Sequence, residues 1–122
     1  MADKCILIID DSTESIDILV DLLKETYKIK AAPNGKLGLK IAGSPSPPDL
    51  IILDIVMPEM DGYEVCRELK ANNSTSDIPV IFMSATSDSD TIKKIDEVGG
   101  ADLFSKPIEP DTVTSMVKKY LS

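Results

Sequence analysis

Five polar side chains of this sequence carry groups that could together handle a phosphate: the adjacent pair Asp10 and Asp11, then Asp54, Ser84 and Lys106. A carboxylate can act as a nucleophile that forms an aspartyl phosphate. A lysine ammonium and a serine hydroxyl can both donate to phosphoryl oxygens. Taken singly, each side chain also fits an ordinary role, as a helix cap, a turn or loop residue, or a solvated charge. Their chemistry therefore depends on whether the fold brings them together.

The elements that must position these side chains alternate along the chain. Five segments are predicted to be strands, at residues 5–9, 27–32, 50–53, 80–83 and 102–105. The runs at 5–9, 50–53 and 80–83 are continuously apolar, which is typical of strands covered on both faces of a parallel sheet. Helical periodicity falls between them, at residues 13–26, around Leu37 and Ile41, and at 62–71, 90–98 and 111–121. We expect one α/β domain over residues 1–122, with a doubly wound parallel sheet and helices on both faces.

Two of the helices carry expectations about single residues. The helix over 90–98 is expected to turn Ile92 and Ile95 inward and to stop at the glycines that follow it. Either Asp11 or Ser12 can cap the helix that starts at residue 13.

Each candidate side chain lies at the end of a predicted strand. Asp10 and Asp11 follow the first strand, Asp54 the third, Ser84 the fourth and Lys106 the fifth. Because sites in open parallel sheets form outside the carboxyl ends of the strands, we expect all five at one edge. Two like charges about 4 Å apart repel by on the order of 4 kcal/mol at an effective dielectric of about 20. A hard divalent cation such as Mg²⁺ would relieve this repulsion, and without metal one carboxylate should take a raised pKa.

Four short motifs resemble the receiver domains of bacterial response regulators, the chemotaxis-regulator-like domains of two-component signalling. They are Ile-Ile-Asp-Asp at 8–11, Leu-Asp-Ile-Val-Met-Pro-Glu-Met-Asp-Gly at 53–62, Met-Ser-Ala at 83–85 and Lys-Pro at 106–107. Each motif is weak alone, but the four in this order are specific and cover nearly the whole chain. The resemblance implies a flavodoxin-like, five-stranded sheet with strand order 2-1-3-4-5. It also implies a signalling domain that catalyses only its own phosphorylation and dephosphorylation, and is not otherwise an enzyme.

The resemblance assigns roles to the acidic residues. Asp54 would be the phosphoacceptor. Asp10, Asp11 and Asp54 would hold Mg²⁺, or Mn²⁺ in its place, together with the backbone carbonyl of Val56.

The resemblance also implies partners for the phosphoryl group. Ser84 and Lys106 would contact it, and the bond between Lys106 and Pro107 is expected to be cis. The donor would be a phosphohistidine on a histidine kinase or a histidine phosphotransfer protein. Phosphorylation would switch the surface of the fourth helix, fifth strand and fifth helix. The downstream target or a fused output domain stays open, as does dimerisation on phosphorylation.

The loop after Asp54 carries further expectations. Pro58 and Gly62 are expected to shape this loop and start the next helix, where Gly62 permits close backbone approach or a positive φ. Val56 and Thr86, each two residues after a site residue, stand where the family tunes loss of the phosphoryl group. Because Val56 offers no polar group to position water, we expect slow to moderate self-dephosphorylation.

Leu103 departs from the family pattern, which places Tyr or Phe three residues before the lysine as a switch coupled to the Ser/Thr. Phe104 is adjacent, but neighbouring residues of a strand face opposite sides. Phe104 could therefore replace the usual aromatic only if the strand were bulged. The output of the domain is consequently less defined than its acceptor chemistry.

Composition narrows the class of protein. The 122 residues are 43% apolar and carry a net charge of −8, which argues against direct binding to nucleic acid or to an anionic membrane. The chain has no histidine, so it offers no histidine base, metal ligand or phosphohistidine. Its two cysteines, Cys5 and Cys66, lie outside any metal-binding or redox spacing and are expected to be reduced and structural. We expect a cytoplasmic location.

Three other functions would use parts of the same pattern. A phosphatase of the haloacid-dehalogenase type also uses an Asp nucleophile and Mg²⁺, but it would need an Asp-x-Asp pattern and usually a cap domain. A flavodoxin-like cofactor binder would need a hydroxyl- and Gly-rich phosphate loop where the acidic pair Asp10 and Asp11 stands. A degenerate receiver used only for docking would be expected to lack the acceptor set, although Leu103 keeps this alternative open.

Overall fold

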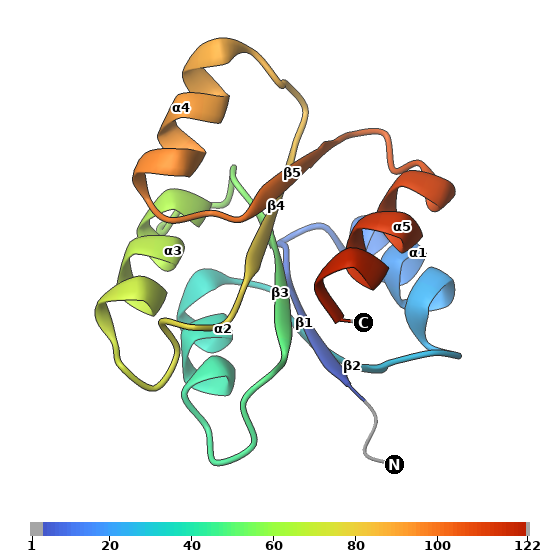
Figure 1. Cartoon of the computed structure of the whole chain (residues 1–122), viewed down its shortest axis with the longest axis horizontal. Helices are drawn as coiled ribbons and strands as arrows, with labels where there is room; N and C mark the ends of the chain where they lie inside the picture. The colour runs from blue at the N-terminus through green and yellow to red at the C-terminus, as the bar shows by residue number, and fades with distance from the viewer. Residues whose placement is uncertain (1–3, 122) are drawn as a thin grey trace.

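The computed structural model describes residues 4–121, which form a five-stranded sheet with helices on both faces (Figure 1). The strands are β1 (Cys5–Ile9), β2 (Lys28–Ala32), β3 (Leu50–Asp54), β4 (Val80–Ser84) and β5 (Asp102–Ser105). The helices are α1 (Thr13–Leu23), α2 (Gly35–Ala42), α3 (Gly62–Ala71), α4 (Ser89–Glu97) and α5 (Pro110–Leu121). Neighbouring strands pair in parallel in the order β2-β1-β3-β4-β5. The predicted fold class and strand order are confirmed.

The central strands divide the core into two layers, because successive side chains point to opposite faces of the sheet. β1, β3 and β4 are buried along their whole length. Leu7, Leu53 and Phe82 pack on one side, towards α2, α3 and the end of α4. Ile8 and Ile52 pack on the other side, towards α1 and α5. Figure 1 shows this division, with α2, α3 and α4 on the left of the sheet and α1 and α5 on the right.

The elements differ from the predicted bounds by a few residues at their ends. α1 ends at Leu23, three residues before the predicted end. Lys24 is its C-terminal cap, with an amide that donates to the Val20 carbonyl, and a turn follows. β3 and β4 each extend one residue further and so include Asp54 and Ser84. These two side chains are therefore held by the sheet itself.

The prediction that Ile92 faces inward is wrong. Ile95 is buried, whereas 52% of Ile92 is exposed. Only the C-terminal end of α4 reaches the core, through Ile95 and Val98. Ile92 lies almost one turn nearer the N-terminal end, which extends beyond the sheet in Figure 1. Hydrophobic spacing identified the helix but not how far it overlaps the sheet.

Both cysteines are free and buried, in agreement with the structural role expected for them. The Cys66 thiol donates to the carbonyl of Val98 across 3.3 Å and so ties α3 to the C-terminal end of α4. Burial raises the pKa of this thiol to about 11. Among residues 4–121, no helix is long and apolar enough to cross a bilayer.

Gly62 starts α3 directly against the end of β3. A Cβ added at this residue would meet the Asp54 carbonyl oxygen and lie 2.9 Å from the Ile55 Cα, both backbone atoms. The Gly62 amide donates to the Ile55 carbonyl at 2.8 Å. Its φ is not positive, since among the described glycines only Gly99 has a positive φ. Close approach is therefore the reason for glycine here.

We predict that Gly62→Ala lowers the free energy of unfolding by roughly 1–3 kcal/mol, because the new methyl group meets backbone that cannot move aside. Urea denaturation would measure the change. Gly43→Ala is the matched control, since a Cβ there would have only the Leu39 carbonyl oxygen nearby, at 3.5 Å. Equal stability of the two variants would contradict the close-approach argument.

Candidate functional site

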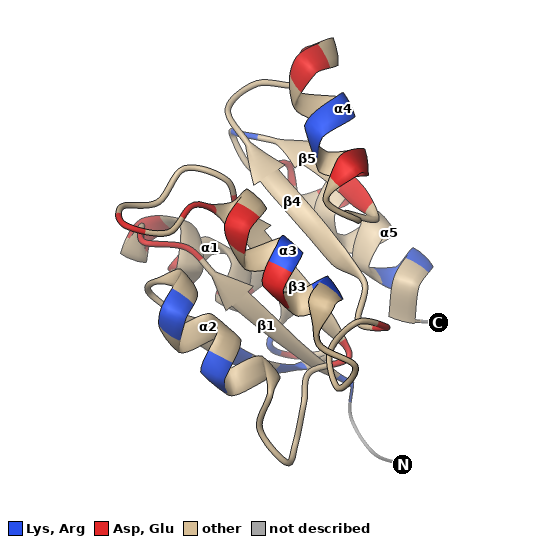
Figure 2. Ribbon diagram, turned by 90° about the vertical axis from the view of Figure 1, so that its left-hand side faces the viewer, with Lys and Arg blue, Asp and Glu red and all other residues tan. Residues whose placement is uncertain are grey.

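The carboxyl ends of four strands bring the candidate side chains together. Asp10 follows β1, Asp54 ends β3, Ser84 ends β4 and Lys106 follows β5. The Lys106 Nζ lies 3.2 Å from the Asp54 Oδ1 and 4.0 Å from the Asp10 Oδ2. Figure 2 shows the acidic segments after β1 and β3 at this end of the sheet. Residues nearly a hundred positions apart thus share one edge.

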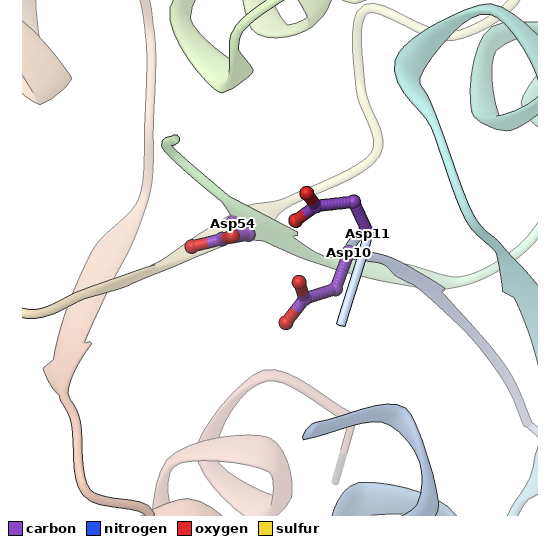
Figure 3. A group of neighbouring side chains, drawn as sticks. All are labelled: Asp10, Asp11 and Asp54. Atoms are coloured by element: carbon purple, nitrogen blue, oxygen red, sulfur yellow. The ribbon is translucent and has the colours of Figure 1, made fainter. Parts of the chain in front are cut away.

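Asp10, Asp11 and Asp54 form a compact carboxylate cluster (Figure 3). Each side chain offers one oxygen, and these oxygens all lie within 4.8 Å of one another. Asp10 and Asp54 are buried, whereas Asp11 is exposed. The cluster is therefore open to solvent on the Asp11 side and closed on the side of the sheet.

The turn after β1 orients Asp10. Its amide donates to the Ala32 carbonyl, and its Oδ1 accepts from the Ser12 amide at 2.9 Å. The Ser12 hydroxyl in turn accepts from the Ser15 amide and caps α1. Of the two capping residues considered from the sequence, Ser12 holds the position. Asp11 is thereby left with its carboxylate directed into the cluster.

The pKa of Asp10 is raised by its position in the cluster. Its Oδ2 is buried and has no hydrogen-bond partner among the described residues. Burial raises the pKa of Asp10 to about 6, the Ser12 amide opposes this rise, and the charge of Asp54 adds to it. The nearby Lys106 ammonium also lowers this pKa, although it does not cancel the effect of burial. A raised pKa in one carboxylate is what the sequence predicted for a metal-free site.

The donor set fits a hard divalent cation. Asp10, Asp11 and Asp54 each offer one carboxylate oxygen within reach of a single ion. On the buried Asp10, the Oδ2 has no hydrogen-bond partner among the described residues. Mg²⁺ and Mn²⁺ prefer such oxygen ligands and keep coordination positions for water or phosphate. An ion bound here would offset the repulsion between the carboxylates.

Ser84 and Lys106 lie on neighbouring strands at the edge of the site. The Lys106 amide donates to the Ser84 carbonyl at 2.8 Å, which continues the pairing of β4 with β5. The Ser84 hydroxyl accepts from the Thr86 amide at 3.1 Å. The peptide bond between Lys106 and Pro107 is cis. The lysine side chain, the serine hydroxyl and Asp54 are therefore presented at the same end of the sheet.

Leu103 and Phe104 point to opposite faces of β5. The strand pairs without a bulge, with Leu103 opposite Phe82 and Phe104 opposite Met83. Phe104 is buried in the layer of α1 and α5, whereas Leu103 is half-buried beside Ile95. Phe104 does not stand in for an aromatic at residue 103, and no aromatic occupies that position.

Sequence reasoning missed a set of contacts beside the site. The hydroxyls of Thr86 and Thr91 lie 3.1 Å apart. Burial raises the pKa of Tyr63, and the nearby Thr91 hydroxyl opposes this rise. The Lys94 ammonium lies 4.8 Å from the centre of the Tyr63 ring. Thr86 could be noted from its position two residues after Ser84. Nothing in the sequence pairs Tyr63 with α4, because the two meet only after α3 and α4 have packed.

Comparison with known proteins agrees with this geometry. A sequence model of the response regulator receiver domain matches residues 6–118. A probable cyclic di-GMP phosphodiesterase of Vibrio cholerae is 42% identical over 116 residues, which are 95% of this chain and 26% of that protein. The two-component response regulator ORR5 of Oryza sativa subsp. japonica is 32% identical over 117 residues, 95% of this chain and 87% of that protein.

A solved structure extends the comparison to three dimensions. The signal receiver domain of a signal transduction histidine kinase from Syntrophus aciditrophicus has a TM-score of 0.87 and 38% sequence identity. The match covers 98% of this chain and 90% of that one. The likeness in sequence and in fold therefore spans the same region of the chain.

We predict that Asp10→Asn stabilises the metal-free protein at pH 7. The folded state holds the Asp10 proton more tightly than the unfolded chain, since its pKa rises from 3.8 to about 6. The stability from this group is present below about pH 4 and is lost as the pH rises through about 6. Asparagine has no proton to lose, so the free energy of unfolding of the variant should exceed that of the wild type by about 1–3 kcal/mol at pH 7. At about pH 4 the two free energies should be equal.

Urea denaturation in EDTA at several pH values would measure this dependence. Asp17→Asn, a substitution of an exposed aspartate on α1, is the control for removing one negative charge. A gain for Asp10→Asn that is the same at acid and neutral pH would argue against a buried carboxylate as its origin.

Proposed function

Because this chain belongs to the response regulator receiver domain family, we propose that it accepts a phosphoryl group on Asp54 and acts as a switch in two-component signalling. The observation that carries the proposal is the contact of the Lys106 ammonium with Asp54, 3.2 Å apart, beside the carboxylates of Asp10 and Asp11. A nucleophile, a cation site and a fixed positive charge then converge at one strand edge. Phosphoryl transfer asks a protein mainly for such positioning and charge stabilisation.

In the proposed reaction, an oxygen of Asp54 attacks the phosphorus of a phosphohistidine. The new O–P bond forms as the P–N bond breaks, and the electron pair stays on the imidazole nitrogen, which takes up a proton. Lys106 pairs with Asp54 before the reaction and afterwards neutralises a phosphoryl oxygen. The Ser84 hydroxyl, now bonded to the Thr86 amide, would donate to another phosphoryl oxygen.

Mg²⁺ fits the acidic cluster as the cofactor of this reaction, and Mn²⁺ could replace it. Asp10, Asp11 and Asp54 would hold the ion, with the backbone carbonyl of Val56 as a further ligand. A bound ion would supply positive charge to the transferring group and offset repulsion with the carboxylates. Support comes from the donor set and from the unpartnered Oδ2 of Asp10.

The donor in this proposal is a histidine kinase or a histidine phosphotransfer protein. In support, the receiver domain from Syntrophus aciditrophicus belongs to a histidine kinase. Phosphorylation would shift a two-state equilibrium at the surface of α4, β5 and α5. The Vibrio relative is named as a phosphodiesterase, and this chain spans 26% of it, so a receiver of this kind can be joined to an output domain. The acidic net charge favours a protein partner over nucleic acid or an anionic membrane.

We predict that acetyl phosphate with Mg²⁺ adds one phosphoryl group to each chain and that Asp54→Asn abolishes this labelling. Intact-protein mass spectrometry would count the groups. Asp77→Asn removes an exposed aspartate from a loop away from the strand ends and is the matched control, which should label fully. EDTA should suppress labelling of both the wild type and the control. Undiminished labelling of Asp54→Asn would remove Asp54 as the acceptor.

We also predict that Val56→Asn speeds loss of the phosphoryl group severalfold, because an amide can position the attacking water. Val56 is 80% exposed and borders the acceptor, so the substitution should not disturb the fold. Decay after removal of acetyl phosphate would be followed by mass spectrometry. Val56→Ala changes size without adding a polar group and should decay at the wild-type rate. Equal decay of the Asn and Ala variants would exclude this position as a control of lifetime.

A further inference from the structure

The two ends of α4 are held by different forces. At the C-terminal end, Ile95 and Val98 are buried in the core, and the Cys66 thiol donates to the Val98 carbonyl. At the N-terminal end, Ile92 is half exposed, and residues 85–90 are exposed. A change that loosens the N-terminal end can therefore leave the other end in place.

Hydrogen bonds between hydroxyls hold the N-terminal end. Asp88 caps the helix by accepting from the Thr91 amide at 2.8 Å. The Thr86 and Thr91 hydroxyls lie 3.1 Å apart, so that one of them donates to the other. Because these groups are partly exposed, water competes for them and the contacts exchange easily.

Tyr63 joins this group from the first turn of α3. The nearby Thr91 hydroxyl opposes the rise that burial causes in the pKa of Tyr63. The Lys94 ammonium, three residues after Thr91 on the same helix, stands 4.8 Å from the centre of the Tyr63 ring. The other side of Tyr63 reaches the core, where its ring centre lies 5.8 Å from that of Phe82. Tyr63 thus connects α4, beside Thr91 and Lys94, to α3 and to the buried layer under it.

The same group reaches the acceptor site through Ser84. The Ser84 hydroxyl accepts from the amide of Thr86, whose own hydroxyl is bonded to Thr91. Hydrogen bonds therefore run from Ser84 through Thr86 to Thr91 on α4, and Tyr63 packs against the same helix at Lys94. Leu103 has no polar group with which to make such a path on the β5 side.

We propose that Tyr63, linked to Ser84 through Thr86 and Thr91, is the aromatic residue that couples the acceptor site to α4 in this protein. This inference rests on the proposed function. When the Ser84 hydroxyl turns to a phosphoryl oxygen on Asp54, the Thr86 amide loses its acceptor and the segment moves. The contact between the Thr86 and Thr91 hydroxyls then opens, and the N-terminal end of α4 separates from Tyr63.

The space that such a shift needs is present. A groove of about 400 Å³ lies between α4 and β5 and is lined by Ile92, Ile95 and Leu103, among others. A leucine at residue 103 fills less of this groove than an aromatic ring would. In this proposal, α4 loses its polar contacts on the side of α3 and shifts towards the groove on the side of β5.

The emission of Tyr63 would test the inference, because the chain has three tyrosines and no tryptophan. In a Tyr27→Phe, Tyr120→Phe background, Tyr63 is the sole source of tyrosine fluorescence. Acetyl phosphate with Mg²⁺ should change this emission in step with labelling measured by mass spectrometry on the same sample. The change should be lost when Asp54→Asn is added to that background.

A matched pair at residue 91 separates coupling from packing. Thr91→Val keeps the shape but removes the hydroxyl, so labelling should remain complete while the emission change is lost. Thr91→Ser keeps the hydroxyl and should retain the change. The pair Thr86→Val and Thr86→Ser should repeat this result if either Thr91 variant unfolds.

The outcomes separate this inference from the proposed function. Full labelling with unchanged Tyr63 emission, or equal emission changes in the Val and Ser variants, would overturn the coupling and leave Asp54 as the acceptor. Absent labelling of the wild type, or labelling that survives Asp54→Asn, would overturn the proposed function and the coupling together.

Discussion

The crowding of three carboxylates at the end of a buried sheet is the constraint on which the rest of the structure depends. Asp10 and Asp54 lie in the protein interior, and among residues 4–121 only Lys106 supplies a compensating charge at short range. Within the described part of the chain, the Asp10 Oδ2 has no hydrogen bond. Such an arrangement lowers the stability of the metal-free protein, as the raised pKa of Asp10 indicates. It persists because the strands that present these residues are stabilised elsewhere.

That stabilisation comes from the two apolar layers. β1, β3 and β4 bury side chains on both faces, so their backbones are held in one register over their whole length. A register slip of one residue would exchange the two layers and move every polar group at the strand ends. The same packing that excludes water from Asp10 therefore fixes the distance between Lys106 and Asp54. Gly62 adds to this by placing α3 against the backbone that carries Asp54.

Much of this arrangement could be predicted from the sequence, because strand ends in a parallel sheet share an edge. That rule places Asp54, Ser84 and Lys106 together without knowledge of any contact. It could not tell that Ser12 rather than Asp11 caps α1, since both fit the cap. It also failed for Ile92, because helical spacing does not say how far a helix overlaps its sheet. The contacts of Tyr63 depend on packing between helices and leave no pattern in the sequence.

Leu103 stands where the family places an aromatic residue. The consequence of this difference depends on how the two ends of α4 are held. A buried aromatic that moved between two positions would need space and a polar partner, and β5 offers a half-buried leucine instead. On the opposite side of α4, an aromatic with a hydroxyl already stands between helix and core. The nearby Thr91 is partly exposed and is joined through Thr86 to Ser84 by consecutive hydrogen bonds. The path from the acceptor site thus reaches the N-terminal end of α4, whereas its C-terminal end is held by the buried Ile95 and Val98 and by the Cys66 thiol. In the proposed switch, a change that begins at Ser84 would therefore reach the more exposed end of the helix first.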